Sequence, residues 1–268
     1  IPLPKNMLKP VAWTRHNAGI GFIIIVTGFG KTAEKRTISM IRAIINPKAG
    51  VIRIKRRMFN SPTIGAENTV SISYAITVCN EAEQLKSLLE CLRPCLTPGD
   101  EIIVQADRSH VTEAVKRVID ASDCIDTYTE HDLQMDFAQA KNHLNTQCRG
   151  QWIFQLDADE CPSPALLQEL RAIIGANPNV ELFKVPRNNI FLNSRGEMER
   201  EFVSWPDYQG RIYLNAPERI QWKRPLHEKI HGYWAYTYLP KEEKYAIVHR
   251  KDKAQDEAKW KNWKQHFA

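Results

Sequence analysis

The chain lacks the sequence features of membrane proteins and of small domains stabilised by zinc or disulfide bonds. Its longest apolar stretch, Gly19 to Gly30, spans only 12 residues and includes several glycines, so it is too short to cross a bilayer. None of its six cysteines forms a Cys-x-x-Cys pair, which indicates reduced thiols in a cytoplasm rather than a zinc site or a disulfide framework. With 268 residues, 43% of them hydrophobic and 25% charged, the chain is long enough for one large α/β domain.

Acidic residues are scarce in the first part of the chain. Residues 1–66 contain 12 Lys or Arg and a single acid, Glu34, whereas the remaining residues are net acidic. This change in composition divides the chain into a basic N-terminal extension, residues 1–66, and a single domain, residues 67–268. Within that domain we expect a first half, 67–160, and a second half, 161–268.

The beginning of the extension has a further peculiarity. The sequence starts at Ile1, and the basic cluster Arg53 to Arg57 stands directly before Met58. We hypothesise that residues 1–57 precede the natural start of the domain at Met58 or, as a second choice, Met40. Alternatively, the basic extension contacts an anionic partner such as nucleic acid or a membrane surface.

The acids cluster most densely where an apolar run ends, in QWIFQLDADE. Asp157, Asp159 and Glu160 place three carboxylates within four residues, and they repel one another unless a cation holds them together. Because side chains alternate along a strand, we expect Asp157 and Asp159 to point to the same side and to share one Mg²⁺ or Mn²⁺. A metal with open positions typically binds a diphosphate. The alternative is a solvated acidic turn before a helix that has Pro162 in its first turn.

Strand and helix patterns alternate between these acids and Val70. The expected strands are Val70–Val78, Glu101–Gln105, a stretch near Ile125–Tyr128 and Trp152–Leu156, and the expected helices are Glu81–Leu92, Thr112–Ala121 and Asp136–Gln147. Such alternation predicts an α/β fold with a mostly parallel central sheet flanked by helices, whose ligands bind beyond the carboxyl ends of the strands. Polar residues follow three of the strands, and we expect one cleft to hold them all: Asn80, Glu81, Asp107, Asp157 and Asp159.

The order and spacing of these segments resemble the nucleotide-sugar half of family 2 glycosyltransferases, which have the GT-A fold. The resemblance is carried by SYAITVCNEAEQLKSLLECL, then VQADRS, then DFAQAKNHLNTQCRGQWIFQLDADE. The second half is similar to the acceptor half of compact, stand-alone members through WPDYQGRIYLN, IQWKRPLHEKIHGY and YAIVHRKD. Members of this type are often encoded by bacteriophages, and others build lipopolysaccharide cores. The resemblance covers Ser71 to Trp263 and leaves the basic extension unexplained.

The resemblance assigns donor-binding roles to the first half. It implies that Asn80 and Glu81 contact the nucleotide and that Asp107 accepts a hydrogen bond from the base. It also implies that Lys141 neutralises the diphosphate and that Asn142 orients the sugar. The alternatives are a turn or capping role for Asp107 and an exposed helical position for Lys141.

Metal and catalytic roles follow in the same way. Asp157 resembles the acid that contacts the ribose or the metal, and Asp159 resembles the direct metal ligand. Glu228 is our candidate general base, and His227 is an auxiliary metal or phosphate contact, although the two could exchange roles. His249 would reach the metal from the opposite wall. Many members place an Asp of a Glu-Asp pair at the position of the general base. Residues 205–232 contain no such pair, so the identity of the general base stays undecided. A packed His beside a surface Glu is the alternative.

Aromatic and hydrogen-bonding residues of the second half suit a sugar acceptor, because the C–H faces of a sugar pack on rings while its hydroxyl groups need partners. The candidates are Trp205, Asp207 and Arg211, with Tyr208, Trp222 and Tyr233 in the same region. The alternative is that the aromatic residues belong to the core, where aromatics of an alternating strand are more often found. A closing helix is expected over Lys251 to Phe267.

Taken together, the sequence predicts a metal-dependent, inverting transferase. It would move a single sugar from a nucleotide-sugar donor, with a UDP-sugar favoured, to a glycan, a lipopolysaccharide or a modified nucleic acid. Single transfer is favoured because the chain lacks the Gln-x-x-Arg-Trp signature of processive synthases. Two alternatives remain: a non-catalytic module that binds glycans or nucleic acid, and a sugar-phosphate nucleotidyltransferase, although VCNEAEQ has no glycine or cation for a triphosphate. The expected location is the cytoplasm, that of the host if a phage encodes the chain.

Overall fold

The computed structural model describes residues 70–192 and 205–252, together with four short strands outside these ranges. Three of those strands form an antiparallel sheet of their own, in the order β1-β2-β3: β1 Phe22–Ile25, β2 Ile41–Asn46 and β3 Val51–Arg56. They fall within the basic extension defined from the sequence. The natural start and the domain boundary stay predictions.

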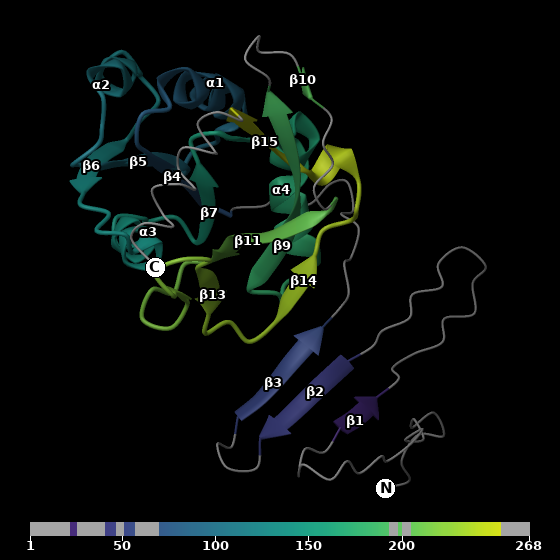
Figure 1. Cartoon of the computed structure of the whole chain (residues 1–268). Helices are drawn as coiled ribbons and strands as arrows, with labels where there is room; N and C mark the ends of the chain where they lie inside the picture. The colour runs from purple at the N-terminus through teal and green to yellow at the C-terminus, as the bar shows by residue number, and fades with distance from the viewer. Residues whose placement is uncertain are drawn as a thin grey trace, which may run out of the picture.

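The first half of the main sheet is wholly parallel, with strand order β6-β5-β4-β7 (Figure 1). Its strands are β4 Ile72–Val78, β5 Glu101–Asp107, β6 Thr127–His131 and β7 Trp152–Asp157. All four were expected from the sequence. β4, β5 and β7 are almost entirely buried, which explains why they consist of continuous apolar runs rather than alternating patterns.

The second half extends the sheet with mixed directions. β11 pairs antiparallel with β7 and with β9, and β15 lies parallel to β9 and antiparallel to β8. The strands are β8 Glu160–Pro162, β9 Leu182–Leu192, β10 Met198–Glu199, β11 Asp207–Leu214, β14 Tyr236–Tyr238 and β15 Ile247–Asp252. A separate two-stranded sheet joins β12 Gln221–Lys223 and β13 Lys229–His231. The predicted α/β class with a large, mostly parallel sheet is confirmed.

The helices are α1 Ala82–Leu92, α2 Glu113–Asp120, α3 Phe137–Asn145 and α4 Pro164–Ala176, with short 3-10 turns η1 Arg93–Cys95 and η2 Glu243–Tyr245. Helices α2, α3 and α4 begin at side chains that cap their free N–H groups, whereas α1 has no side-chain cap. Thr112, Asp136 and Ser163 accept hydrogen bonds from backbone N–H groups in the first turns of α2, α3 and α4. The placement of Pro162 in a first helical turn is wrong: it lies in β8, and Pro164 opens α4.

Two apolar clusters cover the two faces of the sheet. One contains side chains of α1, α2 and α4, and the other contains side chains of α3 and of the β12 and β13 hairpin. Figure 1 shows α1 and α2 on one side of β4, β5 and β7, with α3 on the other. The main sheet and the elements on its two faces therefore form three layers, with an apolar core on each face of the sheet. No helix within the described ranges is long and apolar enough to span a membrane.

A buried carboxylate fixes the strands that carry the site. Glu101, at the start of β5, accepts hydrogen bonds from the Ser73 hydroxyl at 2.5 Å, from Arg149 Nε at 2.9 Å and from the Gly150 amide at 3.2 Å. Burial raises the pKa of Glu101, but these hydrogen bonds outweigh it and hold the pKa below its ordinary value. The carboxylate thereby ties the beginning of β7 to β4 and β5.

The end of the chain differs in part from the expected helix. Lys251 and Asp252 are the last residues of β15, so the strand continues past the point at which the helix was expected to begin. Residues 253–268, which contain the rest of that expected helix, lie outside the described residues.

Candidate active site

The acidic run does not continue as a strand. β7 ends at Asp157, a turn contains Ala158 and Asp159, and β8 begins at Glu160. The amide of Ala158 donates to the carbonyl oxygen of Thr77 at 2.9 Å, which fixes the turn against the end of β4. The alternation used to place Asp157 and Asp159 on the same side therefore does not apply, because it holds only within a strand.

Asp157 lies among cations. Its Oδ2 accepts a hydrogen bond from Arg211 at 2.7 Å, its Oδ1 accepts one from the Thr77 hydroxyl at 2.8 Å, and Lys141 Nζ lies 3.4 Å from Oδ1. Burial favours the neutral carboxyl, but the positive charges of Arg211 and then Lys141 prevail and hold the pKa of Asp157 well below its ordinary value. Asp157 is thus a fixed anion at the edge of the sheet.

Ion pairs extend from Asp157 in both directions. Arg211 also bonds to Glu160 at 2.5 Å, Glu160 accepts from Arg187 at 2.9 Å, and Arg187 bonds to Asp207 at 2.6 Å. On the other side, Lys141 Nζ donates to Oε1 of Glu228 at 2.7 Å. The ionic network therefore alternates in sign and contains Glu228, Lys141, Asp157, Arg211, Glu160, Arg187 and Asp207.

Two predicted acceptor residues belong to this network. The Arg211 side chain is only 4% exposed, and its neighbouring carboxylates raise its pKa against the effect of burial. Asp207 accepts hydrogen bonds from Arg187, Asn189 and Gln209, and its pKa is lowered, because these partners outweigh burial. Both charged groups hold neighbouring side chains of the protein, and their contact with an acceptor stays a prediction. Trp205, the third, is half-buried ahead of β11.

Asp159 has a different neighbour. Its Oδ2 lies 3.1 Å from Nε2 of His249, and Nδ1 of the same ring lies 2.8 Å from the amide oxygen of Asn189. The amide of Arg250 donates to the Asp159 carbonyl at 3.2 Å, which aligns β15 with the turn. Two of the predicted metal ligands are therefore brought together. His249 lies within β15.

The His227 and Glu228 pair lies in the loop between β12 and β13. His227 is exposed and has a positive φ of 53°, so these two residues do not alternate as they would on a strand. The Glu228 side chain is 17% exposed, and no described residue donates a hydrogen bond to its Oε2. In the described part of the chain, no three His, Cys, Asp or Glu side chains are grouped as a metal site, so His227 does not join Asp159 and His249.

The side chains of Lys141 and Asn142 contact other residues of the protein. The Lys141 side chain is 3% exposed and its ammonium lies 4.8 Å from the centre of the Trp222 ring, so the exposed alternative is wrong. Asn142 accepts from the Trp222 amide at 2.8 Å and donates to the Trp222 carbonyl at 2.9 Å. This pair of bonds fixes β12 to α3, and the contact of Asn142 with the sugar stays a prediction. Trp222 itself is buried and belongs to the core.

The nucleotide-contact candidates lie after β4 and β5. Glu81 Oε2 accepts from the amides of Cys79 at 2.8 Å and of Asn80 at 3.0 Å, which shapes the loop before α1. Asn80 is exposed. Asp107 Oδ2 lies 2.7 Å from His110 Nδ1, and Oδ1 accepts from the amide of Leu133 at 3.3 Å. These contacts match the capping role considered for Asp107.

The sequence analysis did not identify Arg187, and it named Glu160 without predicting its partners, Arg187 and Arg211. Arg187 lies on β9 and reaches Glu160 and Asp207, which are 27 and 20 residues away in the sequence. No local pattern predicts such a pairing. Glu160 is fully buried, and the only available signal was that an acid placed directly before a short apolar segment needs a cation.

The family model for glycosyl transferase family 2 matches residues 73–238, which include both Asp157 and Glu228. The chain belongs to glycosyl transferase family 2. The predicted family, the class of enzyme and the GT-A fold are confirmed. The match ends before His249, so it does not cover the partner of Asp159.

Two solved structures are similar to parts of this chain. S. aureus TarS 1-349 in complex with UDP-GlcNAc is 13% identical with a TM-score of 0.48, and the match covers 68% of this chain and 59% of that chain. The mannosyltransferase PcManGT from Pyrobaculum calidifontis in complex with GDP-Man and Mn²⁺ is 19% identical with a TM-score of 0.38, with 48% of this chain and 38% of that chain covered. The present chain thus corresponds to less than two thirds of either structure.

Proposed function

We propose that this protein transfers a single sugar from a nucleotide-sugar donor, a UDP-sugar by preference, to an acceptor hydroxyl group. The observation that carries the proposal is the pairing of Asp159 with His249 beside the ionic network at the end of β7. Parallel strands place ligands at this edge of an α/β sheet. Residues 67–160 would bind the donor and residues 161–268 the acceptor, as one domain in the cytoplasm.

Asp159 and His249 would hold a divalent cation. A carboxylate oxygen and an imidazole nitrogen at 3.1 Å suit Mn²⁺, and the contact of Nδ1 with Asn189 keeps the ring oriented. Mg²⁺ and Mn²⁺ sites commonly use few protein ligands and complete their shell with water and substrate phosphates. The bound cation would neutralise the charge that develops on the departing diphosphate.

Asp157 would position the donor instead of holding the cation by itself. Two cations already face its carboxylate, so a further metal contact would have to compete with Arg211 and Lys141. The loop of Asn80 and Glu81 lies after the neighbouring strand β4 and would contact the nucleotide. Thr77, the next-to-last residue of that strand, donates a hydrogen bond from its hydroxyl group to Asp157.

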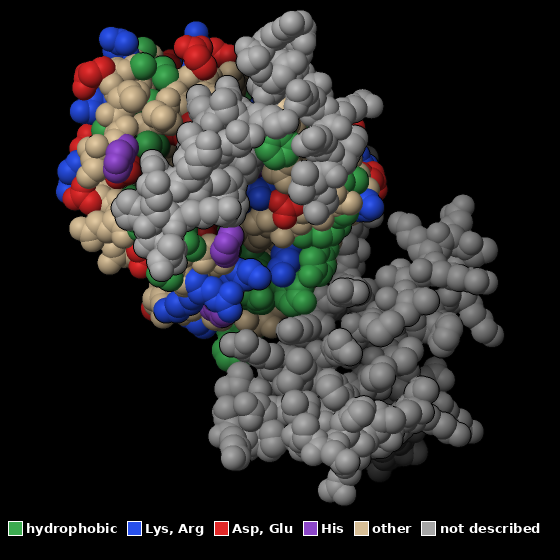
Figure 2. Space-filling model, viewed as in Figure 1, with side chains coloured by type: hydrophobic (Ala, Val, Ile, Leu, Met, Phe, Trp, Pro, Cys, Tyr) green, Lys and Arg blue, Asp and Glu red, His purple; other side chains and the backbone are tan. Residues whose placement is uncertain are grey.

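Glu228 would act as the general base. Its Oε1 is held by Lys141, while Oε2 accepts no hydrogen bond from the described residues and is available to an acceptor hydroxyl. In a single displacement the acceptor proton would move to Oε2 as the acceptor oxygen attacks the sugar carbon, with inversion. Basic side chains gather over β13 in Figure 2, and the hairpin of β12 and β13 that carries Glu228 contains the exposed Lys223, Arg224 and Lys229. With His227 they would contact phosphate groups.

Donor binding provides the first test. Thermal unfolding would be measured with UDP-, GDP-, ADP-, CMP- and dTDP-sugars, in Mn²⁺ or in EDTA, because ligands that bind the folded state raise the melting temperature. We expect one nucleotide family to stabilise the wild type only with Mn²⁺, and Asp159→Ala to abolish the shift. The matched control is Asp123→Ala, which removes an exposed acid paired with Arg93 and should keep the shift.

Turnover provides the second arm. Glu228→Gln should keep the nucleotide-induced shift and lower the transfer rate about 100-fold or more, because the acceptor proton loses its base. Glu218→Gln, an exposed acid ahead of β12, is the control and should transfer normally. Nucleotide binding without transfer to any acceptor would favour the non-catalytic alternative, and formation of a nucleotide sugar from a sugar phosphate would favour the nucleotidyltransferase.

A further inference from the structure

Two cysteines that are far apart in the sequence meet beside the candidate site. Cys91 lies on α1 and Cys161 on β8, and their sulfur atoms are 3.1 Å apart. Both sulfurs also lie 3.7 Å from the carbonyl oxygen of Pro162, and both side chains are half-buried. A disulfide bond is about 2.05 Å long, so a movement of about 1 Å would join them.

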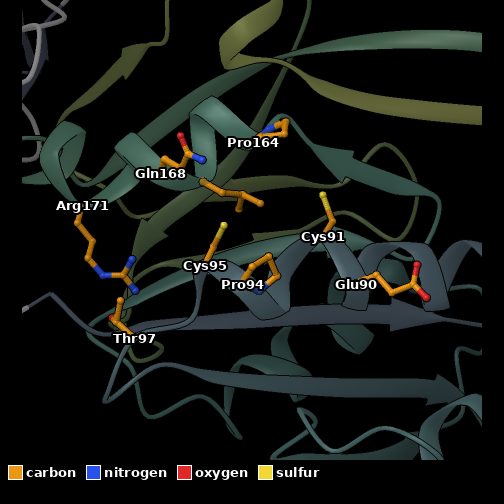
Figure 3. Close-up of a pocket in the computed structure, with 9 residues that line it drawn as sticks. Glu90, Cys91, Pro94, Cys95, Thr97, Pro164, Gln168 and Arg171 are labelled. Atoms are coloured by element: carbon orange, nitrogen blue, oxygen red, sulfur yellow. The ribbon is translucent and has the colours of Figure 1, made fainter.

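A cavity gives small molecules access to one of the two sulfurs. It has a volume of about 420 Å³ and lies between α1, η1 and α4. Figure 3 shows Cys91 and Cys95 on one side of it and Gln168 on the other. Cys161 is not among the residues that line this cavity. A reagent that enters the cavity therefore meets Cys91 before Cys161.

The two thiols that line the cavity, those of Cys91 and Cys95, differ in the direction of their pKa shifts. The Cys161 thiol donates a hydrogen bond to Cys91, and this contact lowers the pKa of Cys91 despite its partial burial. Burial raises the pKa of Cys95, which lines the same cavity, and the nearby Cys91 adds to that effect. Because the thiolate is the attacking species, Cys91 is the nucleophile of this region.

We propose that Cys91 and Cys161 form a thiol–disulfide exchange site for small-molecule disulfides. The Cys91 thiolate attacks one sulfur of a disulfide R–S–S–R, the S–S bond breaks, and the first RS⁻ leaves and takes up a proton. Cys161 then loses its proton and attacks the Cys91 sulfur, which releases the second R–SH. The two protein thiols are oxidised to one disulfide, and the small disulfide is reduced to two thiols.

This site bears on the ionic network because of its place in the fold. Cys161 directly follows Glu160, whose carboxylate holds Arg187 and Arg211. It also pairs with Val248 of β15, next to the pairing of Glu160 with His249. The new disulfide would therefore fasten α1 to β8, the short strand that contains Glu160 and pairs with His249 of β15.

The full chain would be incubated with reduced and oxidised glutathione at stepped ratios, quenched with acid and mapped by mass spectrometry of unreduced peptides. We expect wild-type protein to yield one cross-linked peptide that joins Cys91 to Cys161 and is two hydrogens lighter than its parts. Cys161→Ser should instead retain glutathione on Cys91, because the second step is lost. Cys95→Ser, from the same cavity, is the matched control and should cross-link like the wild type.

Three outcomes would overturn the proposal: free Cys91 and Cys161 at the most oxidising ratio, a bond between Cys91 and Cys95, or loss of the cross-link in Cys95→Ser. A further measurement needs no variant. When native wild-type protein is labelled with limiting iodoacetamide near neutral pH, Cys91 should react about tenfold faster than Cys95. Equal labelling rates would also contradict the proposal.

Discussion

Asp157 and Asp159 stand only two residues apart, yet their surroundings differ. Asp157 ends a buried strand and faces Arg211 and Lys141, whereas Asp159 lies in the following turn and faces His249. The first carboxylate has permanent cationic partners. The second has an imidazole partner, and imidazole is itself a metal ligand when neutral.

The difference shows how a strand end separates two roles that look alike in the sequence. Within the sheet, β11 runs beside β7 and brings Arg211 to Asp157, and burial makes that pairing obligatory. Beyond the strand end, the turn lies against β15, which supplies His249. We therefore regard the Asp157 side as the structural anchor of the site and the Asp159 side as the part where we propose that the cation binds.

Removal of Arg211 should have the largest effect, because it breaks the Asp157 side of the comparison. Arg211→Met leaves Asp157 and the fully buried Glu160 short of a cation. We expect a loss of about 3–5 kcal/mol in the free energy of unfolding, as is usual when one partner of a buried ion pair is removed. Urea unfolding measures this loss.

Arg219→Met is the matched control, since Arg219 also bonds to a carboxylate, that of Glu181, but its side chain is 29% exposed. We expect a loss of about 1 kcal/mol or less. If both variants lost the same amount, the network around Asp157 would not be the anchor that its burial indicates.

Removal of His249 tests the Asp159 side and should have a smaller effect. His249→Ala should raise the Mn²⁺ concentration needed for nucleotide-induced stabilisation by about 10–100-fold, because it removes one candidate ligand. A Mn²⁺ titration of the thermal shift measures this change. His231→Ala, which removes an exposed imidazole at the end of β13, should leave the Mn²⁺ requirement unchanged. An unchanged requirement in both variants would remove His249 from the proposed metal site.

Acidification should have the smallest effect on stability, and it tests the Asp157 side of the comparison alone. Because the pKa of Asp157 is lower in the folded protein than in the unfolded chain, its contribution to stability is present above about pH 4 and is lost as the pH falls through the folded pKa. The difference in unfolding free energy between wild type and Asp157→Asn should therefore shrink below about pH 4, by at most about 1.4 kcal/mol per pH unit. Urea unfolding measures this difference at each pH. If it stayed constant down to pH 2, Arg211 and Lys141 would not lower the pKa of Asp157 in the folded protein.

The parallel half of the fold was predictable because its signals are local. Continuous apolar runs and helical spacing depend only on residues that are close in the sequence. The predicted bounds of β4, β5 and β7, and of α1, α2 and α3, therefore agree with the structure to within one or two residues. Pro162 was misplaced because a three-residue strand intervenes before α4, and such a short strand leaves no periodic pattern.

The sequence by itself determined the α/β class, the family and the concentration of acids after one buried strand. Only the tertiary structure decided which partner each acid has. Arg211, Arg187 and His249 reach Asp157, Glu160 and Asp159 from strands that are paired across the sheet, over separations of 54, 27 and 90 residues. The order of the strands in the sheet decides which side chain lies next to each acid. Because the acids are buried or partly buried, the stability of each charge depends on that partner. The residues around the acids in the sequence therefore predict neither the partner nor its effect.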